Sequence, residues 1–207
     1  MPQFDDPASF WDSRYAEDSY LFGTEPNEFL AREGWRLEPG WHALAVADGE
    51  GRNGVWMAQQ GLRVTSIDVS PRACEKARAL AAARGVELDI RNVDFTDSDM
   101  GTAAFDTVVA IFIQFAPPGT REALFDQMVQ ALKPGGLLFL KGYRPEQVDY
   151  GTGGPPYREH MYTMDLLETQ FAGLEWLHSA SYDAPVREGR GHDGMSALIE
   201  LVARKPG

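Results

Sequence analysis

The chain alternates short apolar segments with segments whose apolar residues recur at helical spacing, and this alternation limits the possible folds most strongly. Strand-like segments lie at residues 42–47, 63–69, 86–93, 105–112 and 137–140, and helical segments lie at residues 54–60, 72–84 and 120–132. The near-continuous apolar run at residues 108–112 is typical of a strand that is buried on both faces. The pattern predicts a parallel sheet with helices packed on it.

Residues that favour helix ends mark several of these boundaries. Ser70 precedes a proline, and this pair is typical of an N-cap followed by the first helical position. Gly61 and Gly85 are each expected to end a helix, because glycine adopts the left-handed conformation found after many helices. Ser9 and Thr120 are expected to begin helices as capping residues.

The last part of the chain has a different pattern. A loop rich in glycine and proline at residues 150–157 precedes a predicted helix at residues 163–171. Two strand-like segments follow at residues 174–182 and 195–203. A charged loop at residues 183–194 is expected to join them, so the two strands should pair as an antiparallel hairpin.

Length and composition restrict the class of function. The 207 residues suit one domain, and the hydrophobic fraction of 43% is ordinary for a globular protein. The net charge of −12 repels nucleic-acid phosphates, so we expect a small-molecule substrate and no nucleic-acid partner. The sequence shows no apolar run of membrane-spanning length and no signal peptide, and its one cysteine excludes an intrachain disulfide. These features predict a cytoplasmic protein with no membrane partner.

A glycine-containing turn after the first strand carries the strongest chemical signal. Gly49 and Gly51 lie between that strand and the following helix, where the backbone can approach a ligand closely. Together with Gly54 they also fit the spacing of a dinucleotide-binding turn. The turn alone therefore leaves the identity of the nucleotide open.

Two acidic residues follow the next strands. Asp68 ends the second strand, 19 residues after Gly49, where a carboxylate can accept hydrogen bonds from both ribose hydroxyls of a nucleoside. Asp94 follows the third strand, where it can bind the exocyclic amine of adenine, and Phe95 beside it offers an apolar face.

The order of these motifs resembles a known family. The motifs are Gly49-x-Gly51-Arg52-Asn53, then Asp68, then Asp94, then Leu132-Lys133-Pro134-Gly135-Gly136. Over nearly the whole chain this order resembles the class I methyltransferases that use S-adenosylmethionine (SAM). The segment at residues 132–136 distinguishes that family from NAD-binding Rossmann proteins. The Gly-Arg-Asn turn, the aromatic segments at residues 10–15 and 22–26 and the glycine-containing loop at residues 189–194 resemble the tellurite-resistance and thiopurine methyltransferase branch.

The resemblance implies a Rossmann-like α/β fold, a three-layer sandwich around a seven-stranded, mostly parallel sheet. The implied strand order is 3-2-1-4-5-7-6, with strand 7 antiparallel. It implies a single methyltransferase domain over residues 1–207. Residues 1–40 would form an N-terminal helical lid segment, and residues 41–207 would form the Rossmann-like core.

The resemblance also implies the cofactor, SAM, with S-adenosylhomocysteine (SAH) as its product, and no metal. Gly49 and Gly51 would pass under the methionine moiety, Asp68 would hold the ribose, and Asp94 with Phe95 would hold the adenine. Three aromatic residues would form a lid whose ring faces attract the sulfonium cation. The full set expected to contact the cofactor is Trp11, Tyr15, Phe22, Ala47, Asp48, Gly49, Gly51, Asn53, Asp68, Val69, Asp94, Phe95 and Ile111.

The chain departs from the family pattern at several positions. Ala45 stands where many members have an acidic residue, and Ala47 stands where many have glycine. The missing acid removes a contact to the methionine amine, for which Asp48 is a candidate replacement. Gln114 follows the fourth strand, where histidine is common in related sequences.

The charged loop near the C-terminus holds the candidate residues for substrate chemistry. His192 is the candidate base, and Arg187 and Arg190 are candidates for binding an anionic substrate. Tyr143 and Gln114 are placed to line the same pocket. A thiol or another soft nucleophile needs little more than deprotonation, whereas an oxygen nucleophile needs a positioned base. Analogy with the family suggests thiols, thiopurines or chalcogen oxyanions as acceptors.

Two other functions fit parts of the sequence. An NAD(P)-dependent oxidoreductase would use the same glycine turn, but the chain has no Tyr-x-x-x-Lys string to act at the nicotinamide. A non-catalytic protein that binds SAM or SAH is the second alternative, and Ala45 and Ala47 favour it. The sequence does not indicate an oligomeric state.

Overall fold

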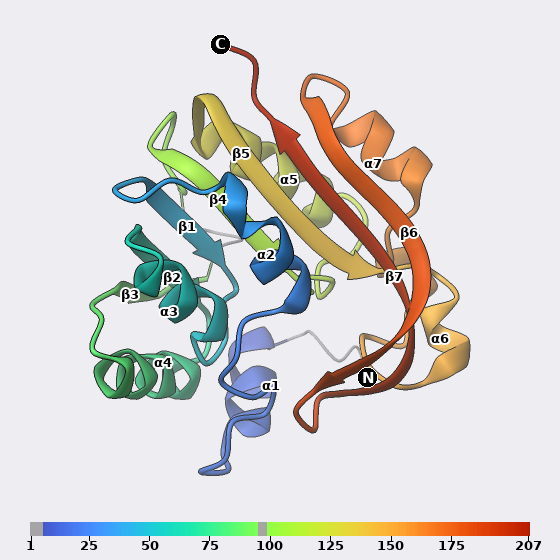
Figure 1. Ribbon diagram of the computed structural model, residues 1–207. Coiled ribbons are helices and arrows are strands. Elements are labelled where there is room, and N and C mark those ends of the chain that lie inside the picture. The colour runs from blue at the N-terminus through green and yellow to red at the C-terminus, as the bar shows by residue number, and fades with distance from the viewer. Residues whose placement is uncertain (1–5, 95–98) are drawn as a thin grey trace.

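The computed structural model describes residues 6–94 and 99–207, in which seven strands form one sheet with helices packed on it (Figure 1). The strands are β1 (His42–Val46), β2 (Arg63–Asp68), β3 (Asp89–Asn92), β4 (Phe105–Ile111), β5 (Leu132–Tyr143), β6 (Glu175–Glu188) and β7 (His192–Arg204). The α-helices are α1 (Pro7–Arg14), α2 (Glu28–Glu33), α3 (Arg52–Gln59), α4 (Pro71–Arg84), α5 (Thr120–Ala131), α6 (Gln147–Tyr150) and α7 (Met164–Gln170). Two short 3₁₀ helices, η1 (Gly34–Arg36) and η2 (Arg158–His160), complete the set.

The strand order is β3-β2-β1-β4-β5-β7-β6, which confirms the predicted topology. The pairs from β3 to β5 are parallel, and β7 runs antiparallel to both of its neighbours, β5 and β6. The order reverses between β1 and β4. In sheets of this kind ligands bind at such a reversal, outside the carboxyl ends of the strands.

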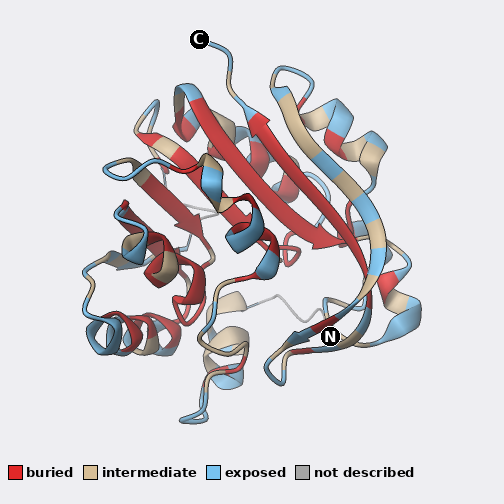
Figure 2. Cartoon of the chain, viewed as in Figure 1, coloured by how far each residue is buried: buried red, intermediate tan, exposed pale blue. Residues whose placement is uncertain are grey.

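The core occupies both faces of the central strands, which are buried along most of their length (Figure 2). Val108 and Ala110 of β4 face one cluster, which includes Phe125 from α5. The alternate residue Val109 faces a second cluster, which includes Phe29 from α2. This alternation explains why the sequence of β4 is apolar without interruption, since both of its faces are covered.

The helix ends agree with the sequence at some positions and correct it at others. Ser70 caps α4 by accepting a hydrogen bond from the Ala73 amide, and Gly85 ends that helix in the left-handed conformation, as predicted. Ser9 is not the N-cap of the first helix, because Asp6 accepts a hydrogen bond from the Ser9 amide and Pro7 opens α1. Gly119, and not Thr120, is the N-cap of α5.

The final hairpin extends further than predicted. The charged segment at residues 183–194, expected to be a loop, is mostly strand, since β6 continues to Glu188 and β7 begins at His192. Only residues 189–191 form the turn. The cause lies in a short alternation, in which half-buried Ala184 and buried Val186 alternate with exposed neighbours. As a consequence, Glu188 and His192 lie directly opposite each other in the ladder.

Candidate functional site

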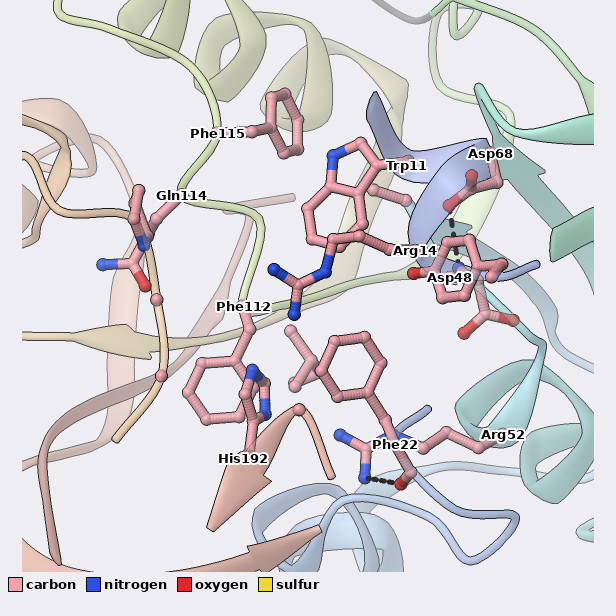
Figure 3. A pocket seen from close by; sticks show the side chains of 18 of the residues that line it. Trp11, Arg14, Phe22, Asp48, Arg52, Asp68, Phe112, Gln114, Phe115 and His192 are labelled. Carbon is pink, nitrogen blue, oxygen red and sulfur yellow. Dashed lines mark hydrogen bonds between the residues drawn. The ribbon is translucent and has the colours of Figure 1, made fainter. Parts of the chain in front are cut away.

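The glycine turn after β1 and the carboxyl ends of β2 and β4 border a cavity that α1 partly covers (Figure 3). Gly49 and Gly51 both have positive φ angles, of 59° and 87°, and Gly51 is the N-cap of α3. A Cβ atom at Gly51 would lie 2.7 Å from the Cβ of Ala77, so glycine is needed both for the turn and for packing against α4. The turn therefore presents its backbone to the cavity.

Two residues that line the cavity are held in a backbone conformation that non-glycine residues rarely adopt. Ala47, at the end of β1, has a φ angle of 49°, and Phe112, at the end of β4, has a φ angle of 58°. Such positions cost of the order of 1–3 kcal/mol and cluster at functional sites. The angle at Ala47 is one that glycine adopts without strain, which agrees with the glycine that the family resemblance implies at this position.

Asp68 is buried at the end of β2 and holds the turn in place. One carboxylate oxygen accepts a hydrogen bond from the amide of Gly49 at 2.8 Å, and the other accepts one from the amide of Ser70 at 2.9 Å. Burial raises the pKa of Asp68 to about 6, although these amide hydrogen bonds oppose the rise. The carboxylate lines the cavity and has lone pairs left for a ligand.

Asp48 lies beside Asp68, but hydrogen bonds from within the protein already occupy its carboxylate. The carboxylate accepts hydrogen bonds from the hydroxyl of Ser66 at 3.0 Å and from the amide of Gly54 at 3.1 Å. Burial raises the pKa of Asp48 to about 7, and the hydrogen bonds from Ser66 and Gly54 oppose this rise. The structure therefore uses this side chain to fix the start of α3 on β2.

The raised pKa of Asp48 predicts a stability effect in the protein without cofactor. An aspartate whose pKa is about 4 when unfolded and about 7 when folded destabilises the fold as the pH rises through that interval. Asp48→Asn should leave the free energy of unfolding nearly unchanged at pH 4 and raise it by about 3–4 kcal/mol at pH 8. Urea unfolding of wild type, Asp48→Asn and the exposed control Asp18→Asn at several pH values measures the difference. A gain at pH 4 as large as that at pH 8 would contradict this account.

The aromatic residues of the N-terminal segment gather over the cavity. The rings of Trp11 and Tyr15 stack with centroids 5.8 Å apart, and the rings of Tyr15 and Phe22 meet edge to face at 6.4 Å. The hydroxyl of Tyr15 lies against Gly49, where an added Cβ atom would come within 2.8 Å of it. Glu50 ties the segment to the glycine turn, because its carboxylate accepts a hydrogen bond from the Leu21 amide at 2.7 Å.

A second aromatic group borders the cavity opposite the glycine turn (Figure 3). The ring of His192 lies 4.5 Å from the rings of both Phe22 and Phe112 and 5.6 Å from that of Tyr143, between centroids. The amide of Gln114 cannot serve a ligand freely, since it both donates to the carbonyl of Tyr143 and accepts from the amide of Tyr143. The Tyr143 hydroxyl is buried and has no hydrogen-bond partner among the described residues.

The structure brings most of the sequence-predicted cofactor residues to this cavity. Those that line it are Trp11, Tyr15, Phe22, Ala47, Asp48, Gly49, Asn53, Asp68, Val69 and Ile111. Gly51 packs behind the turn, and exposed Asp94 is not among the described residues that line the cavity. Phe95 lies outside the described residues.

Of the three residues proposed for substrate chemistry, the structure places only His192 in the cavity. Arg187 is exposed on β6, and Arg190 forms an ion pair with Glu17 at 2.6 Å. Both arginines lie outside the described lining of the cavity. Arg187 lies outside because alternate residues of a strand point to opposite sides, and Arg190 lies outside because it belongs to the turn at residues 189–191.

Sequence reasoning missed two other arginines that do line the cavity, Arg14 and Arg52. Arg14 projects into the middle of the view in Figure 3, and its guanidinium lies 5.4 Å from the ring centroid of Trp11. Trp11, Arg14 and Tyr15 are spaced three and four residues apart, so a helix places them on one face. That spacing is the feature of the sequence that could have identified Arg14 as a residue of the cavity. No local pattern predicts the partner of Arg52, Glu188, which is 136 residues away.

The described residues contain neither a candidate metal centre nor a candidate membrane span. In residues 6–94 and 99–207, no group of three histidine, cysteine or acidic side chains is arranged to hold a metal ion. Over the same ranges, no helix has the length and apolarity needed to cross a membrane.

Comparison with known proteins supports the assignment of the fold. Residues 43–136 match the family described as Methyltransferase domain. The ubiquinone biosynthesis O-methyltransferase of Xanthomonas axonopodis is 36% identical over 108 residues, covering 51% of this chain and 44% of that protein. An uncharacterized protein of Mycobacterium bovis is 33% identical over 103 residues, covering 49% of this chain and 37% of the relative. The chain thus spans less than half the length of these curated relatives.

Solved structures match over much more of the chain. The N-methyltransferase NodS from Bradyrhizobium japonicum, solved in complex with SAH, superposes with a TM-score of 0.71 at 17% identity, covering 98% of this chain and 100% of that chain. TehB from Haemophilus influenzae gives a TM-score of 0.72 at 14% identity, covering 96% of this chain and 67% of that chain. The SAH in the NodS structure is bound by that protein's own copy of this fold. By its strand order and by the match over residues 43–136, the chain has the Rossmann-like fold of a methyltransferase domain.

Proposed function

We propose that the chain is a SAM-dependent methyltransferase that acts on a small molecule. The observation that carries this proposal is the buried carboxylate of Asp68, which holds the amide of Gly49 at the edge of the cavity. A carboxylate at the end of the second strand is well placed to accept hydrogen bonds from the free 2′,3′-diol of a nucleoside. Asp94 and Phe95 remain our proposed contacts to the adenine.

The residues around the turn suit the rest of the cofactor. Aromatic faces from Trp11, Tyr15 and Phe22 would lie near a sulfonium cation, which the ring quadrupole attracts. When bound, SAM would supply an electrophilic methyl carbon and a sulfur that keeps the electron pair of its C–S bond. The chain's own contribution is to orient the acceptor and to exclude water. We propose that α1 and the following segment act as the lid that does so.

We also propose that Arg14 binds the carboxylate of the cofactor's methionine moiety. Its guanidinium lines the cavity together with Gly49, and no ion pair to Arg14 occurs among the described residues. A carboxylate is the anion that matches the planar guanidinium fork.

Arg14→Gln should weaken SAH binding about tenfold, because one charge-assisted contact of about 1.5 kcal/mol is lost. The same variant should bind 5′-methylthioadenosine, which lacks that carboxylate, as tightly as wild type does. Calorimetric titration with both ligands measures the difference, and Arg190→Gln, on the exposed hairpin turn, is the matched control. Equal weakening for the two ligands would show that Arg14 does not bind the carboxylate.

The acceptor side of the cavity favours a small molecule with a flat apolar body. Its walls are the rings of Phe112, Phe115 and Tyr143, with glycines and a proline from the loop after α6. Thiols and thiopurines, the acceptors implied by the likeness to the tellurite-resistance and thiopurine branch, fit such walls. A chalcogen oxyanion has no ring that could pack against these aromatic walls. The net charge of −12 also disfavours a nucleic-acid acceptor.

The test of this function is SAH release from SAM in the presence of small acceptors. We expect turnover with at least one aromatic thiol or hydroxyl compound and none with a nucleic acid. Tight SAH binding without turnover on any acceptor would instead favour a non-catalytic SAM-binding protein.

A further inference from the structure

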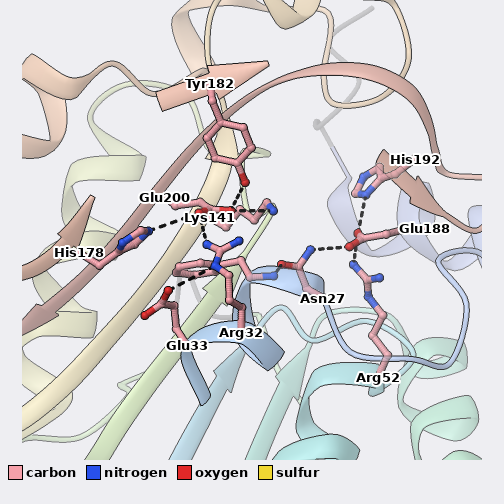
Figure 4. Close-up of polar contacts among 11 residues, drawn as sticks. Asn27, Arg32, Glu33, Arg52, Lys141, His178, Tyr182, Glu188, His192 and Glu200 are labelled. Atoms are coloured by element: carbon pink, nitrogen blue, oxygen red, sulfur yellow. Dashed lines mark hydrogen bonds and ion pairs between the residues drawn. The ribbon is translucent and has the colours of Figure 1, made fainter. Parts of the chain in front are cut away.

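His192 and Glu188 face each other across the hairpin at the edge of the cavity. His192 opens β7, Glu188 ends β6, and the two residues are paired in the antiparallel ladder. The Nδ1 atom of His192 lies 3.6 Å from a carboxylate oxygen of Glu188, which is within ion-pair distance but too long for a hydrogen bond, and this nitrogen has no hydrogen-bond partner among the described residues (Figure 4). The imidazole is buried, with 7% of the residue exposed, and its ring lines the cavity.

Other parts of the chain fix the carboxylate of Glu188. Arg52, from α3, donates to one of its oxygens at 2.6 Å, and the side-chain amide of Asn27, before α2, donates to the other at 2.6 Å (Figure 4). Burial raises the pKa of Glu188, but the neighbouring His192 and Arg52 outweigh burial and hold that pKa at about 2. Glu188 is therefore an ionised group in a set orientation, beside one nitrogen of the imidazole.

The surroundings of His192 also keep the ring in one place and uncharged. The rings of Phe22 and Phe112 contact it from two sides. Burial lowers the pKa of His192, Glu188 opposes that lowering, and the positive charges of Arg52 and Arg14 add to it. Tyr143 is the other titratable residue that contacts the ring of His192. Its hydroxyl has no hydrogen-bond partner among the described residues.

A neutral histidine held against a fixed carboxylate is the arrangement of a general base, in which the carboxylate orients the ring and stabilises the imidazolium. A thiol that ionises near neutrality does not need such a base, whereas a weakly acidic hydroxyl does. We infer that His192 is the general base, positioned by Glu188, for an acceptor that carries a hydroxyl group on an aromatic ring. This inference rests on the proposed methyltransferase function and specifies its acceptor.

The proton transfer is balanced within the site. The O–H bond of the acceptor breaks, the proton joins the imidazole nitrogen that faces away from Glu188, and the oxygen keeps the electron pair that attacks the methyl carbon. The imidazolium that forms is compensated by the carboxylate of Glu188, 3.6 Å away. The aromatic walls at Phe112 and Tyr143 would hold the ring of the acceptor.

The decisive experiment compares phenols with thiophenols that carry the same ring substituents. In His192→Asn and Glu188→Gln, kcat/KM for methylation of the phenols should fall at least 100-fold and at least tenfold, respectively. For the thiophenols, kcat/KM should change less than threefold, because they are largely ionised at pH 8. Asp193→Asn, an exposed neighbour, is the matched control and should match wild type on both series.

A second measurement needs neither SAM nor turnover. The NMR signals of the His192 ring, followed against pH, report the pKa of the imidazole in the folded protein. Glu188→Gln should lower that pKa further, because the negative charge that favours the imidazolium is removed. An unchanged pKa would overturn the positioning role of Glu188.

The possible results separate this inference from the function on which it rests. Equal losses on both acceptor series, or no loss on phenols, would overturn the role of His192. Turnover of thiophenols without turnover of any phenol by the wild type would overturn the hydroxyl acceptor and leave the methyltransferase function intact. Absence of SAH binding together with absence of turnover would overturn both.

Discussion

Replacing Asp68 by asparagine should weaken SAH binding by at least 100-fold. In our proposal the carboxylate accepts two hydrogen bonds from the ribose diol, and bonds to a charged acceptor contribute about 1.5–3 kcal/mol each. Asparagine keeps the shape of the side chain but offers only one acceptor oxygen. It must also replace the carboxylate at the amides of Gly49 and Ser70, which Asp68 already binds.

The binding measurement therefore needs a check on the fold. Calorimetric titration of Asp68→Asn with SAH should be accompanied by thermal unfolding, to show that the glycine turn is still folded. Asp89→Asn, an exposed carboxylate on the neighbouring strand β3, is the matched control and should bind SAH as wild type does. Binding by Asp68→Asn within threefold of wild type would show that this carboxylate does not hold the ligand.

The second large effect is expected at Gly51. Gly51→Ala should destabilise the fold by about 3 kcal/mol, the sum of a left-handed non-glycine residue and an overpacked contact. The added Cβ atom would lie 2.7 Å from the Cβ and 3.0 Å from the Cα of Ala77, and the Cα cannot move without shifting α4. The turn that faces the cofactor would shift with it, so SAH binding should also be lost.

Gly85 provides the matched control, because it separates strain from packing. It has a similar left-handed φ angle of 67°, but an added Cβ atom would meet nothing within 4 Å. Gly85→Ala should therefore cost about 1–2 kcal/mol, from backbone strain alone. Urea unfolding of both variants gives the two free energies, and equal losses at the two positions would contradict the packing argument.

Much of the fold could be predicted from the sequence because the signals are local and repeated. The alternation of strand and helix periods, with Ser70 and Gly85 at helix ends, identified the helices that cover a parallel sheet. The strand order itself followed from the resemblance, since hydrophobic periodicity does not determine which strands are neighbours. The end of the hairpin was missed because charged residues mask the short alternation of Ala184 and Val186.

The candidate site could likewise be predicted only in part. The cofactor side was largely predictable, because Gly49 and Asp68 are recognisable from their spacing and from the strands that they follow. The acceptor side was not, because its members meet only through tertiary packing. Arg52 reaches Glu188 across 136 residues, and Glu188 faces His192 only because β6 continues into the segment predicted to be a loop. A contact of this kind has no signal in a single sequence.

The most direct test of the central claim is equilibrium binding of SAH and NAD to the wild-type protein, measured by calorimetry and by tryptophan fluorescence. Trp11 lies in the cavity wall, so a bound ligand should change its emission. We predict micromolar binding of SAH, with a fluorescence change that is lost in Trp11→Phe, and no measurable binding of NAD. Absence of SAH binding would contradict the assignment of the cavity to SAM, and binding of NAD in its place would support a dinucleotide-dependent enzyme.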